Sequence, residues 1–481
     1  MGPRRRELHL KIAAVLDRQD GLGTTTEPEQ VALHYGWAGH HEKAAQLYRK
    51  AALRARGRYA LIERDQHLQQ AVLHARSLPD ELARSALELE VLIELGLAQI
   101  DHRGSGYDDV RATFERARDL CLELENHTRL VVVLDALALN YHFARSESAQ
   151  MLQYAAELDD VAVRGTLPLA ALWAARMRGS ARLLRGEFET ARMEMETVVA
   201  RYKEIETETA GTRTARDPRS STYGNLAICL TAQGRITDAM AALHDGMRHA
   251  RQSKSMPSIM ASLRRACLQG MIVRDNARVL TQASQLIAFN TEHETFTGLR
   301  EGTIAQGWAT IHTAGSVEVL KAMLVSLDEL QQAQHFVHLP FLLSAVAEQA
   351  WLIGDRNTAL ALLQRASSLL DRTGEVWCHA ELVRLEAQFC QGNERATVAL
   401  LQKSLRIARD QGAAWWELRA AADLAELWAR AGAVSKARAL LQATVPRFAH
   451  SPGLPDTMRA QALLSGLTKP RGKGATVTTV H

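Results

Sequence analysis

Small and apolar residues recur at steps of three and four along much of the chain, most regularly between residues 341 and 442. In the last copy of this pattern, one helical face carries Leu418, Ala421, Ala425 and Trp428. Gly432 predicts the end of that helix, because glycine takes the left-handed conformation just past a helix C-terminus at little cost. A second apolar face over residues 437–445 predicts a second helix, so the repeating unit is a helix pair.

Glycines mark the ends of earlier copies at nearly constant distances. Gly354, Gly392 and Gly432 are 38 and 40 residues apart, and Gly315 lies 39 residues before Gly354. A period near forty predicts a stack of helix pairs, since one pair cannot bury its apolar face alone. We therefore expect an all-α fold, a tetratricopeptide-like α-solenoid of stacked antiparallel helix pairs.

The same pattern divides the chain into segments. Pro28 is a favoured first-turn residue and predicts the start of the array. The residues around 204–222 are polar and include Asp217-Pro218, which predicts a loop that splits the array. In chain order we expect an N-terminal helix and loop (1–27), a first array (28–203), the polar loop (204–222), a second array (223–467) and a disordered basic tail (468–481).

Composition agrees with a helical globular protein. Hydrophobic residues make up 47% and charged residues 23%, which excludes a disordered chain, and the 11 prolines leave long helical windows. A net charge of +4 over 481 residues provides no field that would recruit nucleic acid or a membrane surface. No apolar run approaches eighteen residues, so we expect no membrane span and a cytoplasmic protein.

Candidate metal and redox chemistry is weak. The five cysteines form no Cys-x-x-Cys pair and lie within apolar helical patterns, which predicts reduced, buried thiols. The adjacent pair His40-His41 precedes Glu42, but Ala45 stands where a helical zinc motif needs its second histidine. We expect a solvated loop there, and neither a metal site nor a cofactor site.

Candidate catalytic chemistry is weak as well. Gly21-Leu-Gly-Thr lacks the lysine of a phosphate-binding loop. The acid pairs Asp108-Asp109 and Asp159-Asp160 have no neighbouring base, so a solvated helix face explains them. We therefore predict no catalytic residue.

Trp415 and Trp416 are a candidate partner contact, because two adjacent indoles cannot both point into the same core from one helix. One of them could be exposed for a partner. Packing against the next repeat explains the pair as well, and we favour packing.

Several strings resemble one group of bacterial proteins. They are Pro28-Glu29-x-x-Ala32-x-His34-Tyr35, Thr373-Gly374-Glu375-x-Trp377-x-x-Ala380-Glu381-Leu382-x-Arg384-Leu385 and Trp416-Glu417-Leu418-Arg419-Ala420-Ala421. Together they resemble the helical arm of large regulators that join a class III nucleotide cyclase or a winged-helix domain to a STAND-type ATPase and a C-terminal tetratricopeptide array. Cys378 departs from that pattern, where a second aromatic residue is frequent.

The resemblance covers residues 7 to about 467 and concerns the arm alone, because the sequence carries no cyclase metal carboxylates, Walker motifs or helix-turn-helix. It implies a non-enzymatic interaction or regulatory arm whose concave face holds a protein segment, with a separately encoded ATPase or cyclase as the partner. Three alternatives stay open: a small-molecule effector-sensing array, a retained cyclase or ATPase activity, and the remnant of a split gene. The basic tail is the only feature that would favour nucleic acid.

Overall fold

The structure is a computed structural model. It describes residues 2–21, 27–58, 60–103, 106–141, 146–165, 167–205, 218–293, 296–311, 316–390, 392–451 and 453–468. Within these ranges there are helices and turns but no strand, so the predicted all-α fold class is confirmed. Gly315, residues 206–217 of the predicted loop and residues 469–481 of the predicted tail lie outside the described residues, so the expectations for them remain predictions.

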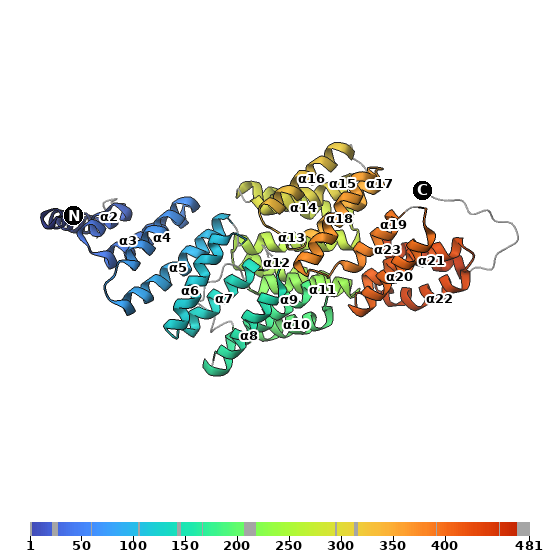
Figure 1. The fold of residues 1–481 in the computed structure, drawn as a ribbon, viewed down its shortest axis with the longest axis horizontal. Coiled ribbons are helices and arrows are strands. Elements are labelled where there is room, and N and C mark those ends of the chain that lie inside the picture. Colours follow the sequence, from blue (N-terminus) through green and yellow to red (C-terminus); the bar gives the residue numbers. More distant parts are fainter. Residues whose placement is uncertain are drawn as a thin grey trace. The chain divides into compact units, whose positions relative to one another are not determined.

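The chain forms two compact units, which are described separately. The first takes in Met1–Ala144 and Gln153–Ala174, and the second takes in Arg145–Leu152, Ala175–Glu206 and Arg216–His481. The helices that lie wholly or mainly in the first unit are α1 (Pro3–Gly21), α2 (Pro28–Ala38), α3 (His41–Gly57), α4 (Leu61–Arg76), α5 (Glu81–Arg103), α6 (Asp108–Glu123), α7 (His127–Asn140) and α8 (Ser148–Gly165) (Figure 1).

The remaining helices lie wholly or mainly in the second unit. They are α9 (Pro168–Leu184), α10 (Phe188–Ile205), α11 (Pro218–Ala232), α12 (Ile236–Gln252), α13 (Met256–Val273), α14 (Asn276–Glu292), α15 (Phe296–Thr310), α16 (Ser316–Gln332), α17 (Leu339–Leu352), α18 (Arg356–Thr373), α19 (His379–Phe389), α20 (Glu394–Asp410), α21 (Ala414–Arg430), α22 (Val434–Thr444), the 3-10 helix η2 (Val445–Phe448) and α23 (Pro455–Thr468).

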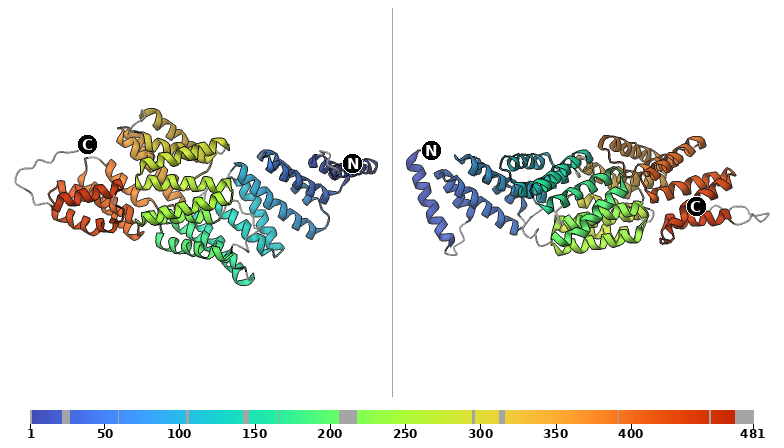
Figure 2. Two further views of the ribbon diagram at one scale, coloured as in Figure 1. Left: turned by 180° about the vertical axis from the view of Figure 1, so that it is seen from behind. Right: turned by 90° about the horizontal axis from the view of Figure 1, so that it is seen from below.

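Within the second unit the helices form the predicted stack. Each described helix from α10 onward packs against the next helix in the chain, as the side-by-side coils in Figure 2 show. The odd-numbered helices from α11 to α23 also pack against the next odd-numbered helix. They are therefore the inner helices of a series of antiparallel pairs.

Glycine turns join the two helices of several pairs, as the sequence predicts. Gly354, Gly392 and Gly432 have φ angles of +93°, +86° and +82°. This left-handed backbone strains any residue that carries a Cβ. The space around each of the three is open, so the backbone conformation alone requires glycine there.

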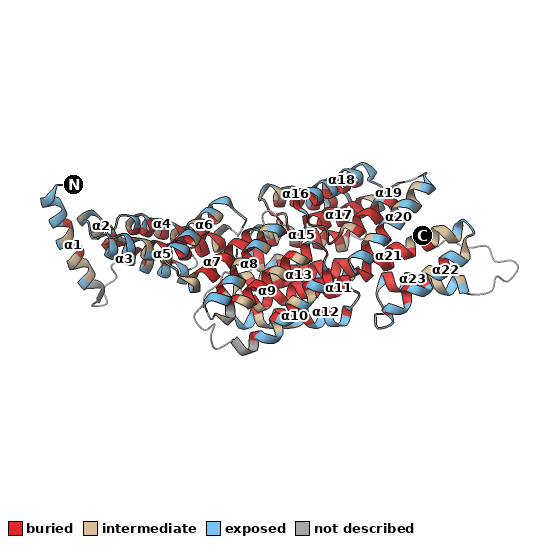
Figure 3. Cartoon of the chain, turned by 60° about the horizontal axis from the view of Figure 1, so that its bottom comes forward, coloured by how far each residue is buried: buried red, intermediate tan, exposed pale blue. Residues whose placement is uncertain are grey.

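Inner and outer helices differ in burial. In α17 every residue from Leu339 to Ala350 is buried, whereas its partner α18 buries one face only. Figure 3 shows the same contrast between α11 and the exposed side of α12. Four of the cysteines are buried and Cys390 is half-buried, all as free thiols. Across the described residues no helix is both long enough and apolar enough to span a membrane.

Candidate functional site: the charged inner face of α13 to α23

Charged side chains lie at corresponding positions on successive inner helices of the second unit. The first such series, which we call the first ladder, alternates in sign and consists of Glu348, Arg384, Asp423 and Arg459. Arg384 donates to Glu348 Oε1 and to Asp423 Oδ2 at 2.8 Å each. Arg459 Nη1 donates to Asp423 Oδ1 at 2.6 Å. The ladder thus joins α17, α19, α21 and α23 by hydrogen-bonded ion pairs.

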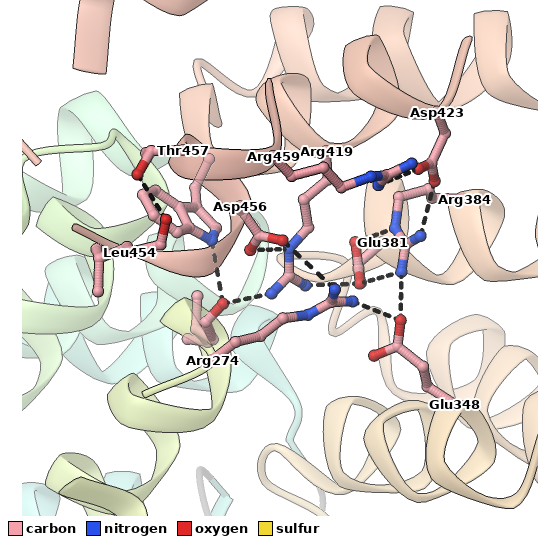
Figure 4. A network of polar contacts seen from close by, with 12 residues as sticks. Arg274, Glu348, Glu381, Arg384, Arg419, Asp423, Leu454, Asp456, Thr457 and Arg459 are labelled. Carbon is pink, nitrogen blue, oxygen red and sulfur yellow. Dashed lines mark hydrogen bonds and ion pairs between the residues drawn. The ribbon is translucent and has the colours of Figure 1, made fainter. Parts of the chain in front are cut away.

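A second ladder runs beside the first and consists of Glu381, Arg419 and Asp456. Arg419 Nη1 donates to Glu381 Oε1 at 2.7 Å, and its Nε donates to Asp456 Oδ2 at the same distance. Arg384 connects the two ladders, because it also contacts both oxygens of Glu381 at 2.9 Å (Figure 4). Most of the arginine donors therefore have a carboxylate partner with the short geometry of charge-assisted bonds.

The C-terminal end of α13 is the point where this network meets an earlier part of the chain. Arg274, the left-handed residue that ends α13, contacts Glu348 at 2.5 Å and Asp456 at 3.4 Å. The carbonyl oxygen of Ile272 accepts from Arg419 Nη2 at 2.6 Å and from Trp415 Nε1 at 3.0 Å. These bonds satisfy a carbonyl that the end of a helix leaves without an intrahelical partner. They hold α13 to α21, more than 140 residues further along the chain.

Burial and mutual charge set the ionisation of the network. Burial opposes the charged form of Glu348, but the attraction of Arg274 and Arg384 outweighs it and lowers the pKa of Glu348 to about 2. The same balance, first of burial and then of neighbouring arginines, leaves the pKa values of Asp423 and Asp456 below their ordinary value. These carboxylates are therefore charged at neutral pH.

The arrangement acts as a clamp. Four arginines face four carboxylates, and Arg384, Arg419 and Asp456 expose 5% of their side chains or less. Paired charges of this kind favour one register of the inner helices, because a shifted register would leave buried charges without partners. Between α13 and α21 the inner face is thus already occupied by contacts within the chain. The expectation of a concave face that holds a protein segment remains a prediction.

The structure places the two candidate tryptophans in the interior. Trp415 and Trp416 are both fully buried. Trp415 packs against Phe448 with ring centroids 5.7 Å apart, whereas Trp416 lies 6.2 Å from Phe341 and 6.4 Å from Trp377. The indoles point to different neighbours, so both find core environments from one helix. This agrees with the packing that we favoured from the sequence, and the alternative, that one indole is exposed as a partner contact, is wrong for this structure.

His41 and Glu42 also differ from expectation, because they belong to the first turn of α3 and not to a loop. The Nδ1 atom of His41 lies 3.0 Å from Nδ1 of His74 in α4. Among the described residues, no three His, Cys, Asp or Glu side chains are grouped as a metal ion would require.

The ladders were not predicted from the sequence, although Glu381, Arg384 and Arg419 belong to the strings quoted there. The sequence feature that could have revealed the ladders is the alternation of acidic and basic residues about one repeat apart. Partners along the first ladder are 36, 39 and 36 residues apart, and partners along the second are 38 and 37 residues apart.

Comparison with known proteins gives a distant relative and a set of helical structures. No protein-family profile matches the chain. An uncharacterized protein of Rhizobium meliloti (strain 1021) is 22% identical over 433 residues, which cover 88% of this chain and 41% of the relative. The chain therefore spans about two fifths of the length of that relative.

Among solved structures, a Rap protein complexed with the competence and sporulation factor has a TM-score of 0.47 at 12% identity. The match covers 72% of this chain and 98% of that protein. A signal-transduction ATPase with numerous domains and a tetratricopeptide repeat sensor, from Pyrococcus horikoshii, has a TM-score of 0.33 at 12% identity, with 89% of this chain and 68% of that protein covered. At these scores we draw no functional argument from them, and the helix-pair fold rests on the geometry described above.

Proposed function

We propose that this chain is a non-enzymatic, tetratricopeptide-like arm that binds a protein partner in a bacterial signalling system of the STAND ATPase or nucleotide cyclase type. The observation that carries the proposal is the fold. Helix pairs follow one another through the second unit and are clamped by the two ladders, a construction that offers extended, rigid surfaces for binding.

The sequence comparison supports the description as an arm. The chain matches a part of a much longer relative, as an interaction region within a multidomain protein would. The strings that resemble the arm of STAND regulators supply the class of partner, a separately encoded ATPase or cyclase.

The closed inner face changes where a partner is expected to bind. The charged side chains of the ladders already bind one another along the inner helices from α13 to α21. We therefore place the partner on other surfaces of the chain. This also disfavours a small-molecule effector bound between these helices, since the arginines and carboxylates there already bind one another.

Affinity capture from a native lysate tests the function, with the full chain as bait and mass spectrometry as readout. The control bait carries Gly354→Pro and Gly392→Pro, because proline cannot adopt the φ of +93° or +86° found at these turns. We expect an ATPase or cyclase to be captured by the natural chain and lost with the control. A bait with a native circular dichroism spectrum that captures neither would refute the proposal.

A further inference from the structure

A further buried carboxylate, separate from those of the ladders, contacts residues just before α8, α17 and α19 in the second unit. Glu375 follows the end of α18, and its side chain is fully buried. Its Oε2 lies 2.5 Å from Ser146 Oγ, and its Oε1 accepts from Trp377 Nε1 at 2.6 Å. Its carboxyl group also accepts from the backbone N–H of His338 at 2.9 and 3.1 Å.

Two of these partners have unusual backbones. Ser146 and His338 are among the few described residues other than glycine with left-handed φ angles, +54° and +60°. Such conformations cost free energy and persist where surrounding contacts hold them. Glu375 bonds to both, so one side chain stabilises the left-handed backbone at Ser146, just before α8, and at His338, in the turn before α17.

Ser146 lies in a short segment of the second unit that separates two stretches of the first unit along the chain. Residues Arg145–Leu152 belong to the second unit, while the residues on both sides of them along the chain, up to Ala144 and from Gln153, belong to the first. The bond between Ser146 and Glu375 therefore holds the segment through which the chain passes between its two units.

The charges around Glu375 do not form an ion pair of the ladder type with it. The imidazole Nδ1 of His338 is 3.4 Å from Oε1, but burial and then the nearby Arg265 and Arg264 keep the pKa of His338 far below its ordinary value, so the ring is neutral. Arg265 in α13 acts on Glu375 from further away. Arg264, Glu301 and His335 contact one another.

Burial has the largest effect on the pKa of Glu375. It raises the pKa of Glu375 to about 7, despite the hydrogen bonds from Ser146, Trp377 and His338 and the charge of Arg265, all of which act in the opposite direction. The carboxyl group therefore binds and releases its proton near neutral pH.

We propose that Glu375 is a proton-controlled anchor for residues 146–152. With its proton bound, Oε2–H donates to Ser146 Oγ, and the buried contact is one between two neutral groups. When the proton passes to solvent, a buried anion remains, and the segment opens to let water reach it. This inference goes beyond the proposed function and requires no partner.

The direction of the pH dependence follows from the difference in the pKa of Glu375 between the closed and the open state. A carboxyl whose pKa is higher in the closed state than in the open state stabilises closure at low pH, and this stabilisation is lost as the pH rises from the ordinary value of 4.5 toward 7. Between pH 6 and pH 8 the opening equilibrium should increase about tenfold.

Hydrogen exchange of the full chain tests the anchor. The readout is protection of the peptide that contains residues 146–152, corrected for the intrinsic pH dependence of exchange. We expect about a tenfold loss of protection from pH 6 to pH 8 in the natural chain. Glu375→Gln, which keeps the shape without the charge, should abolish this dependence. Glu386→Gln removes an exposed carboxyl from α19 and should leave it intact.

Two results would overturn the proposal: a flat profile in the natural chain, or a Glu375→Gln profile that matches the natural one. If Glu375→Gln fails to fold, infrared spectroscopy of the natural chain decides instead. A protonated carboxyl band must then disappear with a midpoint near pH 7, and the absence of such a band refutes the anchor. Ser146→Ala should lower protection of this peptide at pH 6, and unchanged protection would count against the contact itself.

Discussion

Arg419 in α21 donates from Nη1 to Oε1 of Glu381 in α19 at 2.7 Å, and the two residues lie 38 positions apart, one repeat along the chain. Both side chains are almost completely buried. In a helical repeat this contact does what an apolar pair does elsewhere, since it fixes one inner helix against the next. It differs in being specific for charge, so its removal leaves a partner that the interior cannot solvate.

The first prediction concerns Arg384, which contacts Glu348, Glu381 and Asp423. Arg384→Ala leaves three carboxylates without this partner, and we expect it to lower the free energy of unfolding by about 3–5 kcal/mol. Arg430 pairs with Glu426 at the surface with 70% of its side chain exposed, so Arg430→Ala should cost about 0–1 kcal/mol. Urea denaturation followed by circular dichroism compares the stabilities of the two variants. Equal midpoints would show that the ladder does not contribute to the stability of the fold.

The second prediction is sensitivity to acid. Because the pKa values of Glu348, Asp423 and Asp456 are lowered in the folded chain, the stability they provide is complete above their ordinary values near 4 and is lost as the pH falls through the folded values, about 2 for Glu348. Urea midpoints measured from pH 6 down to pH 2 should fall below pH 4. An unchanged midpoint at pH 2.5 would contradict the charged state assigned to the ladders.

The sequence predicts the helix pairs because their signals are local. Apolar residues three and four apart define one face of each helix, and Gly354 or Gly392 at the end defines the turn. These signals depend on neighbours along the chain alone, so the stack and its period follow without knowledge of the tertiary fold.

The clamp needs information that local patterns do not contain. Charged residues such as Glu348, Arg384 and Asp423 are usually solvated, and no neighbour along the chain identifies the helix that covers them. The bonds from Trp415 and Arg419 to Ile272 join residues more than 140 positions apart. The ladders could have been predicted from charges that alternate in sign about one repeat apart. The contact between α13 and α21 could not, because it depends on the tertiary arrangement of helices far apart in the chain.

The third prediction compares two turn glycines. Gly354 has φ of +93° and open space around it, so Gly354→Ala should cost about 1–2 kcal/mol for the left-handed backbone alone. Gly234 has φ of +80°, and a Cβ there would lie 2.6 Å from the ring of Phe448 in η2. Gly234→Ala should therefore cost about 1–3 kcal/mol more, because the ring must also move.

Thermal and urea unfolding of the two alanine variants measure this difference. Gly234→Ala combined with Phe448→Leu provides the control, since the smaller side chain should recover part of the additional cost. If the two single variants are equally stable, the close approach of η2 to the α11–α12 turn is not a constraint on the fold.

The last prediction concerns two histidine pairs in the first unit. The Nδ1 atoms of His9 and His34 are 2.9 Å apart, and those of His41 and His74 are 3.0 Å apart. A hydrogen bond between two imidazoles needs one nitrogen to accept, so protonation of both rings breaks it. Burial first, and then the neighbouring ring, lowers the pKa values of His34 and His74.

For a histidine with a lowered pKa in the folded state, stability is complete above the ordinary value of 6.5 and is lost as the pH falls below it. We therefore expect hydrogen exchange in α3 and α4, corrected for intrinsic rates, to accelerate between pH 7 and pH 5. His74→Gln should reduce this dependence. His244 lies on α12 with 80% of its side chain exposed, so His244→Gln should leave the dependence unchanged. If His74→Gln retains the full acceleration, the His41–His74 contact is not the source of the pH dependence.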